Sequence, residues 1–279
     1  MLHVCLAFHD ATGVYYRYAA TTLYSVAVHS ASPLCAHIIH DATLGPGARR
    51  ALERLARSCG VELAFHDMQP VLAAYAAIAT NWRYGVGSLF RFCLPRCIPD
   101  TEVLYLDCDI IALMDVATVF AAGQTRPDYL VGCVPDRGAD YTAEVKAHVR
   151  RLGLEPKSYF NSGVLLLHTG RIAAVVPDFA RACLNICARN PGTDFADQDA
   201  LNLFFARLPR LWLPESCNTF MDFLPWLMLE EEQLRGRILH YTGTKPWVDT
   251  RFPSSRVFAR YHAEALARMG EQGGCVLGG

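Results

Sequence analysis

Short apolar segments alternate with amphipathic ones through the first half of the chain, and this alternation restricts the possible folds more than any other feature. The apolar segments cover residues 2–8, 36–40, 61–65, 103–106 and 130–134. Between the first three lie two stretches with apolar residues at helical spacing: Ala19, Leu23, Val26 and Ala27, then Leu52, Leu55, Ala56 and Cys59. Strands separated by helices form a parallel sheet with helices on both faces. We therefore predict an α/β fold with a Rossmann-like, mostly parallel sheet.

The second half of the chain is less regular. Residues 159–167 contain a strand-like run, residues 171–189 have helical spacing, and residues 238–241 form a short strand. No internal repeat, low-complexity segment or interdomain linker is present in the sequence. We expect one domain over residues 1–250, followed by a C-terminal helix and a frayed, glycine-rich tail over residues 251–279.

Charge and composition exclude two classes of protein. The 279 residues include 26 Lys and Arg against 27 Asp and Glu, which gives a formal net charge of −1. This balance argues against a protein that holds nucleic acid through bulk electrostatics. A hydrophobic content of 52% with 19% charged residues excludes intrinsic disorder.

The sequence predicts no membrane span. No run approaches ~18 apolar residues, and the first ten residues lack the basic region of a signal peptide. Peripheral contact with the inner face of a membrane stays open because of four arginines near the C-terminal end: Arg251, Arg256, Arg260 and Arg268.

The eleven cysteines do not indicate a disulfide framework. Their number is odd, nearly all lie in apolar segments, and no CxxC pair is present. We interpret them as buried free thiols that pack as small hydrophobic side chains. A reducing, cytoplasmic environment is the expected consequence.

The segment VLYLDCDIIAL, residues 103–113, carries the clearest functional signal. Residues i and i+2 of a strand point to the same side, so we expect Asp107 and Asp109 to project together at the carboxyl end of the strand. Two adjacent carboxylates repel each other, and a divalent cation shared with phosphate oxygens would relieve that repulsion. The alternative is a pair of solvated turn aspartates, which the wholly apolar preceding strand disfavours.

Three further groups precede helices or strands at positions suited to ligand binding. Asn161 in YFNSGVLLL offers amide donors and an acceptor for a sugar hydroxyl, or belongs to an ordinary turn. Asp197 and Gln198 lie at the start of a helix, where acidic residues are also common caps. Arg91 lies between Phe90 and Phe92, so it either meets a buried carboxylate or phosphate or reaches the surface over a buried stem.

The segment ILHYTGTKPW, residues 238–247, gathers four residue types that suit a phosphate and a metal. His240 can act as an imidazole ligand, although a lone histidine is often structural. Gly243 leaves room for a phosphate against the backbone, and Lys245 supplies a positive charge to it. We expect Trp247 to enclose the site.

In this order along the chain, the motifs resemble glycosyltransferase family 8. The order is an Asp after the first strand, a helical Arg, DxD, FN(S/A)G, DQD and HxxG..KPW, over about residues 2–248. The family includes glycogenins and bacterial lipopolysaccharide galactosyl- and glucosyltransferases. The resemblance implies a GT-A fold, Mn²⁺ or Mg²⁺, a UDP-hexose donor and a saccharide or glycolipid acceptor. It also implies retention of anomeric configuration and a place in bacterial surface glycan synthesis.

The resemblance also implies roles for individual residues. Asp107, Asp109 and His240 match the metal ligands, with Asp107 also near the donor, and Asp10 matches the residue at the uracil end. The positions that match groups near the donor sugar are Arg91, Asn161, Asp197 and Gln198. Gly243 and Lys245 match the diphosphate contacts, although Thr244 alone separates them where the family usually has two residues.

Three other functions are compatible with parts of the sequence. A catalytically silent UDP-sugar binder would keep the same motifs without turnover. A haloacid-dehalogenase-type phosphatase also has an apolar strand followed by DxD, but its motif lies near the chain start and needs a downstream acidic pair. A nicotinamide oxidoreductase is disfavoured because the run 85–87 lacks the third glycine of its fingerprint. The sequence leaves the oligomeric state open.

Overall fold

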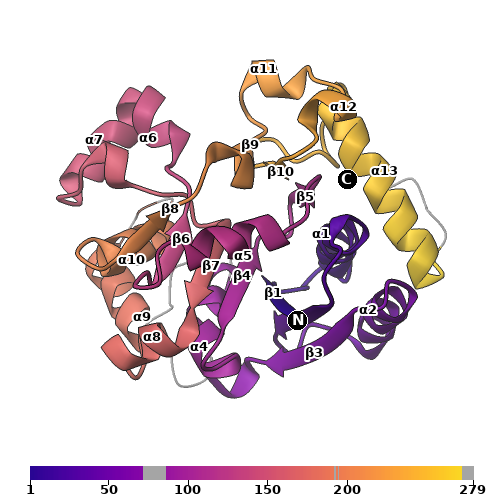
Figure 1. Ribbon diagram of the computed structural model, residues 1–279, viewed down its shortest axis with the longest axis horizontal. Coiled ribbons are helices and arrows are strands. Elements are labelled where there is room, and N and C mark those ends of the chain that lie inside the picture. The colour runs from indigo at the N-terminus through magenta and orange to yellow at the C-terminus, as the bar shows by residue number, and fades with distance from the viewer. Residues whose placement is uncertain (72–85, 192, 194, 272–279) are drawn as a thin grey trace.

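A seven-stranded sheet forms the centre of the computed structural model, which describes residues 1–71, 86–191, 193 and 195–271. The strand order is β3–β2–β1–β4–β7–β6–β8 (Figure 1). The bounds are Leu2–Ala7 (β1), Leu34–His40 (β2), Glu62–Asp67 (β3), Glu102–Leu106 (β4), Val131–Cys133 (β6), Val164–His168 (β7) and Arg210–Trp212 (β8). All neighbouring pairs are parallel except those of β7, which runs antiparallel to β4 and β6. The predicted mostly parallel sheet is confirmed.

Strand β4 is buried on both faces, which explains why its sequence is apolar without alternation. Leu104 and Leu106 belong to the hydrophobic core on one side of the sheet. Val103 and Tyr105 belong to the core on the other side. All four side chains are inaccessible to solvent.

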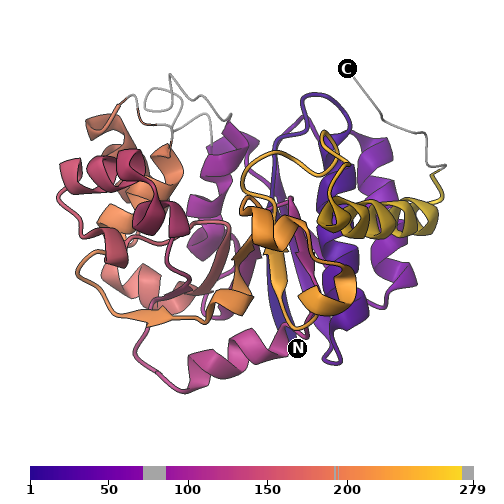
Figure 2. The ribbon, with the colours of Figure 1, turned by 90° about the horizontal axis from the view of Figure 1, so that it is seen from above.

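Helices cover both faces of the sheet, as predicted (Figure 2). Helices α1 (Tyr15–His29), α2 (Pro46–Ser58) and α13 (Pro253–Met269) pack on one core. The 3₁₀ helix η1 (Val86–Cys93) and helices α9 (Phe179–Arg189) and α10 (Ala196–Phe205) pack on the other. The shorter helices are α4 (Leu94–Cys97), α5 (Ala117–Gln124), α6 (Arg137–Tyr141), α7 (Ala143–Arg151), η2 (Pro156–Ser158), α8 (Thr169–Val175), η3 (Glu215–Cys217), α11 (Leu224–Leu227) and α12 (Glu231–Leu234).

One helix predicted from the sequence is divided into two in the structure. The single helix expected over 171–189 is two helices, α8 and α9, because Pro177 lies between them and Asp178 caps the second by accepting from the Arg181 N–H. In the C-terminal region, α13 packs against α1 and α2. The frayed tail was expected at the end of the chain, and residues 272–279 lie outside the described residues.

A second, three-stranded sheet brings distant segments to the end of β4. Its order is β5 (Ile110–Ala112), β10 (Ile238–His240), β9 (Thr219–Phe220). Strand β10 pairs antiparallel with β5, which places His240 opposite Ile110. The Tyr241 N–H then donates to the Asp109 carbonyl at 3.1 Å. This pairing carries residue 240 to the acidic turn that follows β4.

All ten cysteines in the described part of the chain are free thiols, seven of them buried. This agrees with the interpretation of the cysteines as hydrophobic packing residues. No helix within the described ranges has both the length and the apolar composition that a membrane span requires.

Candidate active site

A cavity of about 570 Å³ opens beyond the carboxyl ends of β1 and β4. Eight of the sequence-predicted site residues line it: Arg91, Asp107, Asp109, Asn161, Asp197, Gln198, His240 and Lys245. They come from η1, the β4–β5 turn, the segment before β7, α10 and the segment around β10. The crossovers of the main sheet and the pairing of β5 with β10 therefore assemble one site from distant parts of the sequence.

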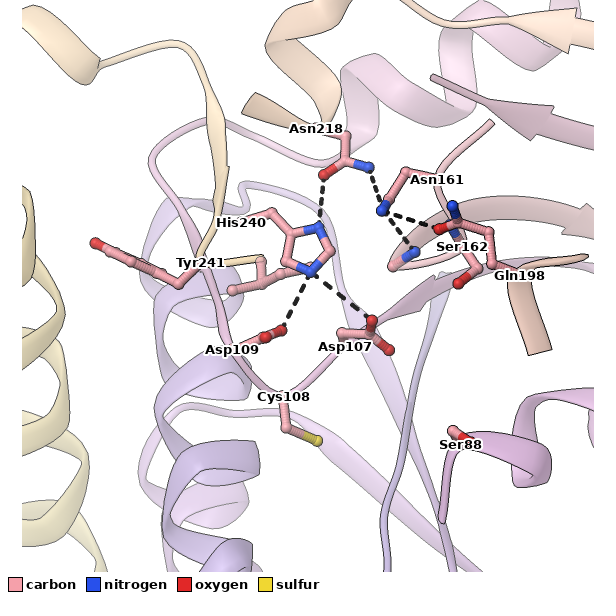
Figure 3. Close-up of polar contacts among 12 residues, drawn as sticks. Ser88, Asp107, Cys108, Asp109, Asn161, Ser162, Gln198, Asn218, His240 and Tyr241 are labelled. Carbon is pink, nitrogen blue, oxygen red and sulfur yellow. Dashed lines mark hydrogen bonds and ion pairs between the residues drawn. The ribbon is translucent and has the colours of Figure 1, made fainter. Parts of the chain in front are cut away.

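Three metal-ligating side chains meet in this cavity (Figure 3). The His240 Nε2 lies 3.3 Å from Asp109 Oδ1 and 3.8 Å from Asp107 Oδ2. One ligand atom from each of the three residues lies within 4.8 Å of the others. Their oxygen and imidazole donors suit a divalent cation such as Mn²⁺ or Mg²⁺.

A chain of side-chain amides extends from His240 deeper into the protein (Figure 3). The His240 Nδ1 lies 2.9 Å from Asn218 Oδ1, and Asn218 Nδ2 donates to Asn161 Oδ1 at 3.0 Å. Asn161 Nδ2 in turn donates to Gln198 Oε1 at 3.1 Å. The segments that precede β7 and β9 and the first turn of α10 are joined to His240 by this chain.

Two backbone N–H groups determine which atom of each amide is the oxygen, because a backbone N–H can only donate. The Gly163 N–H donates to Asn161 Oδ1 at 2.9 Å, and the Ser162 N–H donates to Gln198 Oε1 at 3.1 Å. The Asn218 atom that faces Asn161 Oδ1 must then be the nitrogen, and its other atom must be the oxygen. The His240 Nδ1 therefore carries a proton and donates it to Asn218 Oδ1.

This proton leaves the opposite ring nitrogen of His240 facing two carboxylates. A neutral imidazole with its proton on Nδ1 has a lone pair on Nε2. Asp109 Oδ1 is buried and has no hydrogen-bond partner within the described residues. A cation between Nε2 and the carboxylate oxygens would satisfy both. The residues present therefore fit a divalent metal.

Arg91 is buried and joins two of the acidic residues. Its guanidinium contacts Asp107 Oδ1 at 2.9 Å and Asp197 Oδ2 at 3.3 Å, and it donates to the Ser162 carbonyl at 2.7 Å. Burial lowers the pKa of Arg91, but the nearby carboxylates of Asp107 and Asp197 raise it overall, so the side chain stays charged. Burial also raises the pKa of Asp197, against the opposing effect of Arg91.

Lys245 reaches the same cavity despite the short spacing after Gly243. Its ammonium lies 2.5 Å from Asp109 Oδ2 and also donates to the Tyr241 carbonyl at 2.8 Å. Burial raises the pKa of Asp109, but His240, when its ring is protonated, and the ammonium of Lys245 lower it well below its usual range. Asp109 is therefore an ionised carboxylate at neutral pH, as a metal ligand must be.

Gly163 allows the imidazole to approach the acidic turn. A Cβ at this position would lie 2.1 Å from His240 Cε1 and 2.8 Å from Asp107 Oδ2. No side chain fits there without moving the imidazole. Glycine is thus required by this close approach and not by its backbone angles.

Three predicted residues do not line the cavity. Asp10 is buried, and its Oδ1 accepts from the Tyr15 N–H at 2.6 Å near the start of α1. Gly243 lies against Asp222, whose Cβ would be 3.0 Å from an added Cβ. Trp247 does not enclose the site as expected, because it stacks on Tyr18 with ring centroids 3.8 Å apart. The roles of Asp10 and Gly243 stay predictions.

Sequence reasoning missed Asn218 and Asp136. Asn218 fixes the tautomer of His240, and Asp136 Oδ2 accepts from Gln198 Nε2 at 2.9 Å. Asn218 precedes a two-residue strand that has no periodic signal, so only the three-dimensional pairing reveals it. Asp136 follows the apolar segment 130–134, and its place after a strand was the one available signal.

The described fold and site can be compared with known proteins. The chain is 29% identical over 238 residues to the lipopolysaccharide glucosyltransferase WaaO of Escherichia coli (strain K12), covering 81% of this chain and 68% of WaaO. It is 26% identical over 150 residues to galactinol synthase 1 of Solanum lycopersicum, covering 53% of this chain and 45% of that protein. The match with galactinol synthase 1 thus spans less than half of that relative.

The structure is similar to that of the galactosyltransferase LgtC in complex with donor and acceptor sugar analogs. The TM-score is 0.74 at 20% sequence identity, over 94% of this chain and 96% of that chain. This likeness confirms the GT-A fold expected from the motifs. The sequence model of glycosyl transferase family 8 matches residues 5–251. The chain therefore belongs to glycosyl transferase family 8.

Proposed function

We propose that this protein is a retaining hexosyltransferase that moves glucose or galactose from a UDP-sugar to a saccharide acceptor. The observation that supports it most is the convergence of His240 Nε2, Asp107 and Asp109 in a cavity large enough for a ligand. Such a group is suited to a divalent cation, Mn²⁺ or Mg²⁺, held by three protein ligands. The remaining coordination positions are left for phosphate oxygens.

When bound, the cation supplies positive charge that stabilises the diphosphate as it leaves the sugar. Lys245 adds a second positive charge on the same side of the cavity. In the structure its ammonium contacts Asp109, and we propose that it turns to the diphosphate when donor and cation are bound. The short link between Gly243 and Lys245 does not prevent this, because Lys245 already lines the cavity.

Asn161 and Gln198 present their amides to the donor sugar. Each amide oxygen accepts two hydrogen bonds within the protein, and each amide nitrogen donates one. One N–H of Asn161 is therefore left for a sugar hydroxyl, as far as the described residues show, whereas the Gln198 amide has a further hydrogen bond with the Tyr159 side chain. Asp197, held by Arg91, is the neighbouring acceptor for the hydroxyl protons of the sugar.

We infer that transfer occurs by attack from the face of the leaving group. A double displacement needs a carboxylate at the anomeric carbon. Gln198 is an amide and a poor nucleophile, and Asp197 is engaged by Arg91. In the proposed step, the acceptor oxygen bonds to the anomeric carbon as the bond to phosphate breaks, and the departing phosphate accepts the acceptor proton.

The acceptor, biosynthetic role and location that we propose are based on the relatives. WaaO is a lipopolysaccharide glucosyltransferase, and the LgtC structure holds donor and acceptor sugar analogs. We propose a saccharide or glycolipid acceptor, a role in bacterial surface glycan synthesis and a cytoplasmic location at or near the inner face of the membrane. Free thiols throughout the described chain support a reducing compartment.

A panel of UDP-sugars tests the proposal, with release of UDP measured in the absence of acceptor. We expect UDP release from UDP-glucose or UDP-galactose with Mn²⁺, loss of that activity with EDTA, and recovery when Mn²⁺ is added back. Activity that persists in EDTA with the metal removed would contradict the site assignment.

Calorimetry with UDP distinguishes the proposed enzyme from a catalytically silent binder. A silent protein would bind UDP with Mn²⁺ but would release none from any UDP-sugar in the panel. The phosphatase alternative lacks support, because the sequence model of glycosyl transferase family 8 matches residues 5–251. A generic phosphomonoester should therefore not be hydrolysed.

A further inference from the structure

A second group of metal-ligating side chains lies on the opposite part of the sheet. His3 on β1 and Cys35 on β2 are paired in register, and each is the second residue of its strand. His37 follows Cys35 by two residues, so the three side chains share one face of the sheet. They lie toward the amino ends of the strands, whereas Asp107 and Asp109 follow the carboxyl end of β4.

The ligand atoms of this group are already close together. His37 Nε2 lies 3.0 Å from His3 Nδ1 and 3.5 Å from Cys35 Sγ. In a tetrahedral zinc site, two nitrogen ligands are about 3.3 Å apart, and a nitrogen and a sulfur ligand about 3.6 Å apart. The observed distances differ from these values by only a few tenths of an ångström.

His37 Nε2 is shared between two hydrogen-bond neighbours. A ring nitrogen has either one proton or one lone pair, so His37 Nε2 cannot form a full hydrogen bond with both His3 and Cys35. One cation between the three atoms would be a partner for all of them.

A third histidine, His66, contacts the ring nitrogen of His37 that points away from His3 and Cys35. His37 Nδ1 lies 3.0 Å from His66 Nε2, and the rings of His3, His37 and His66 stack in sequence across three strands. When Nδ1 donates to His66, the lone pair of His37 is on Nε2. Metal-binding histidines commonly donate their second ring N–H in this way.

We propose that His3, Cys35 and His37 form a second metal site, for Zn²⁺ or a cation of similar softness. Thiolate and imidazole ligands favour such metals over the hard cations expected at the carboxylate group. Binding would release the thiol proton of Cys35 to solvent as the metal–sulfur bond forms. The fourth position would be taken by water or by Glu62, which is in register with Cys35 on β3. The ion would join β1 to β2, and to the edge strand β3 if Glu62 ligates it.

Zinc titration calorimetry of the full chain tests this site. All proteins carry Asp109→Asn so that the carboxylate group does not compete. We expect one equivalent of Zn²⁺ to bind, and Cys35→Ser and His3→Gln each to weaken that binding at least tenfold. Cys59→Ser, which replaces another half-buried free thiol, is the matched control and should leave the affinity unchanged.

Cobalt gives a second measurement that reports sulfur ligation directly. We expect Co²⁺ to produce a thiolate-to-metal charge-transfer band in the parent protein and in Cys59→Ser, and no such band in Cys35→Ser. Circular dichroism checks that each variant is folded, and His3→Gln provides the test if Cys35→Ser is not. Equal zinc affinity in the parent and in the folded variants, or no charge-transfer band in the parent, would overturn the proposal.

Discussion

The two groups of metal-ligating residues differ in how they are built: one lies beyond the carboxyl end of β4, where the chain passes to the three-stranded sheet, and the other lies toward the amino ends of β1 and β2. Asp107, Asp109 and His240 come from turns and strand ends, and they face a cavity. His3, Cys35 and His37 lie within neighbouring strands and are positioned by strand register. The first group can leave coordination positions open for substrate, whereas the second suits a site that joins strands. The two groups would thus support two kinds of metal chemistry, distinguished by donor type and by access.

The two groups also differ in the residues that hold their histidine ligands in place. His240 is held by an amide chain that ends at backbone N–H groups, and His37 is held by the ring of His66. In both cases the supporting group binds the ring nitrogen on the side away from the expected metal. When the supporting group accepts the ring proton, the opposite ring nitrogen presents a lone pair toward the ion before it binds.

The largest expected effect comes from Gly163→Ala. The added Cβ would lie 2.1 Å from His240 Cε1, so the imidazole must leave the carboxylates. We expect UDP-sugar turnover to fall by about 10³-fold or more, since the metal supplies several kcal/mol of transition-state stabilisation. Gly45→Ala, where an added Cβ meets no atom within 4 Å, is the control. With Asp109→Asn added to both variants, zinc binding should be the same, and its loss in Gly163→Ala would show that the two groups are not independent.

Lys245→Ala should reduce the rate of transfer by about 10²-fold. Removal of one donor to a developing negative charge typically has an effect of this size. The affinity for UDP should change less than the rate, because the nucleoside contacts are untouched. Steady-state kinetics combined with calorimetry separates the two quantities. An unchanged rate would indicate that the ammonium stays with Asp109 during turnover and does not reach the diphosphate.

Asn218→Ala removes the acceptor that orients His240. We expect the Mn²⁺ concentration for half-maximal activity to rise by about 10- to 100-fold, while the rate at saturating Mn²⁺ stays near that of the parent. Asn202→Ala is the control, since Asn202 is also buried but bonds the backbone of Phe160 and not His240. If both variants shift the Mn²⁺ requirement equally, Asn218 has only a structural role.

The smallest expected effect is on thermal stability. Zinc at 100 times its Kd should stabilise the folded chain by about 2.7 kcal/mol, which raises the Tm by several degrees, on the order of 5–10 °C. Cys35→Ser should show a much smaller rise under the same conditions. Differential scanning calorimetry measures both. A similar rise in Tm for both proteins would mean that zinc binds elsewhere.

Much of the sheet and of the carboxylate group could be predicted from the sequence. Strand β4 is buried on both faces and is therefore apolar without interruption, so a buried strand before Asp107 could be predicted from the sequence alone. The antiparallel direction of β7 could not be predicted, because its run of apolar residues is compatible with either strand direction. Pro177 lies between α8 and α9, and the helical spacing of the flanking residues concealed the interruption.

The parts of the site that escaped prediction depend on contacts between segments. Asn218 belongs to no motif and becomes relevant only because β9 pairs with β10. Asp10 follows β1 as expected, and its carboxylate accepts from the Tyr15 N–H near the start of α1, a contact that the sequence did not reveal. His3 and Cys35 are 32 positions apart in sequence, and only strand register places them together.

Calorimetric titration of UDP with and without Mn²⁺, in the parent protein and in Asp109→Asn, tests the carboxylate site most directly. Asn has nearly the shape of Asp but lacks the charge that a cation requires. We expect the parent to bind UDP at least tenfold more tightly with Mn²⁺, and Asp109→Asn to show no such difference while remaining folded. A UDP affinity that is equally dependent on Mn²⁺ in both proteins would contradict a metal site at Asp107, Asp109 and His240.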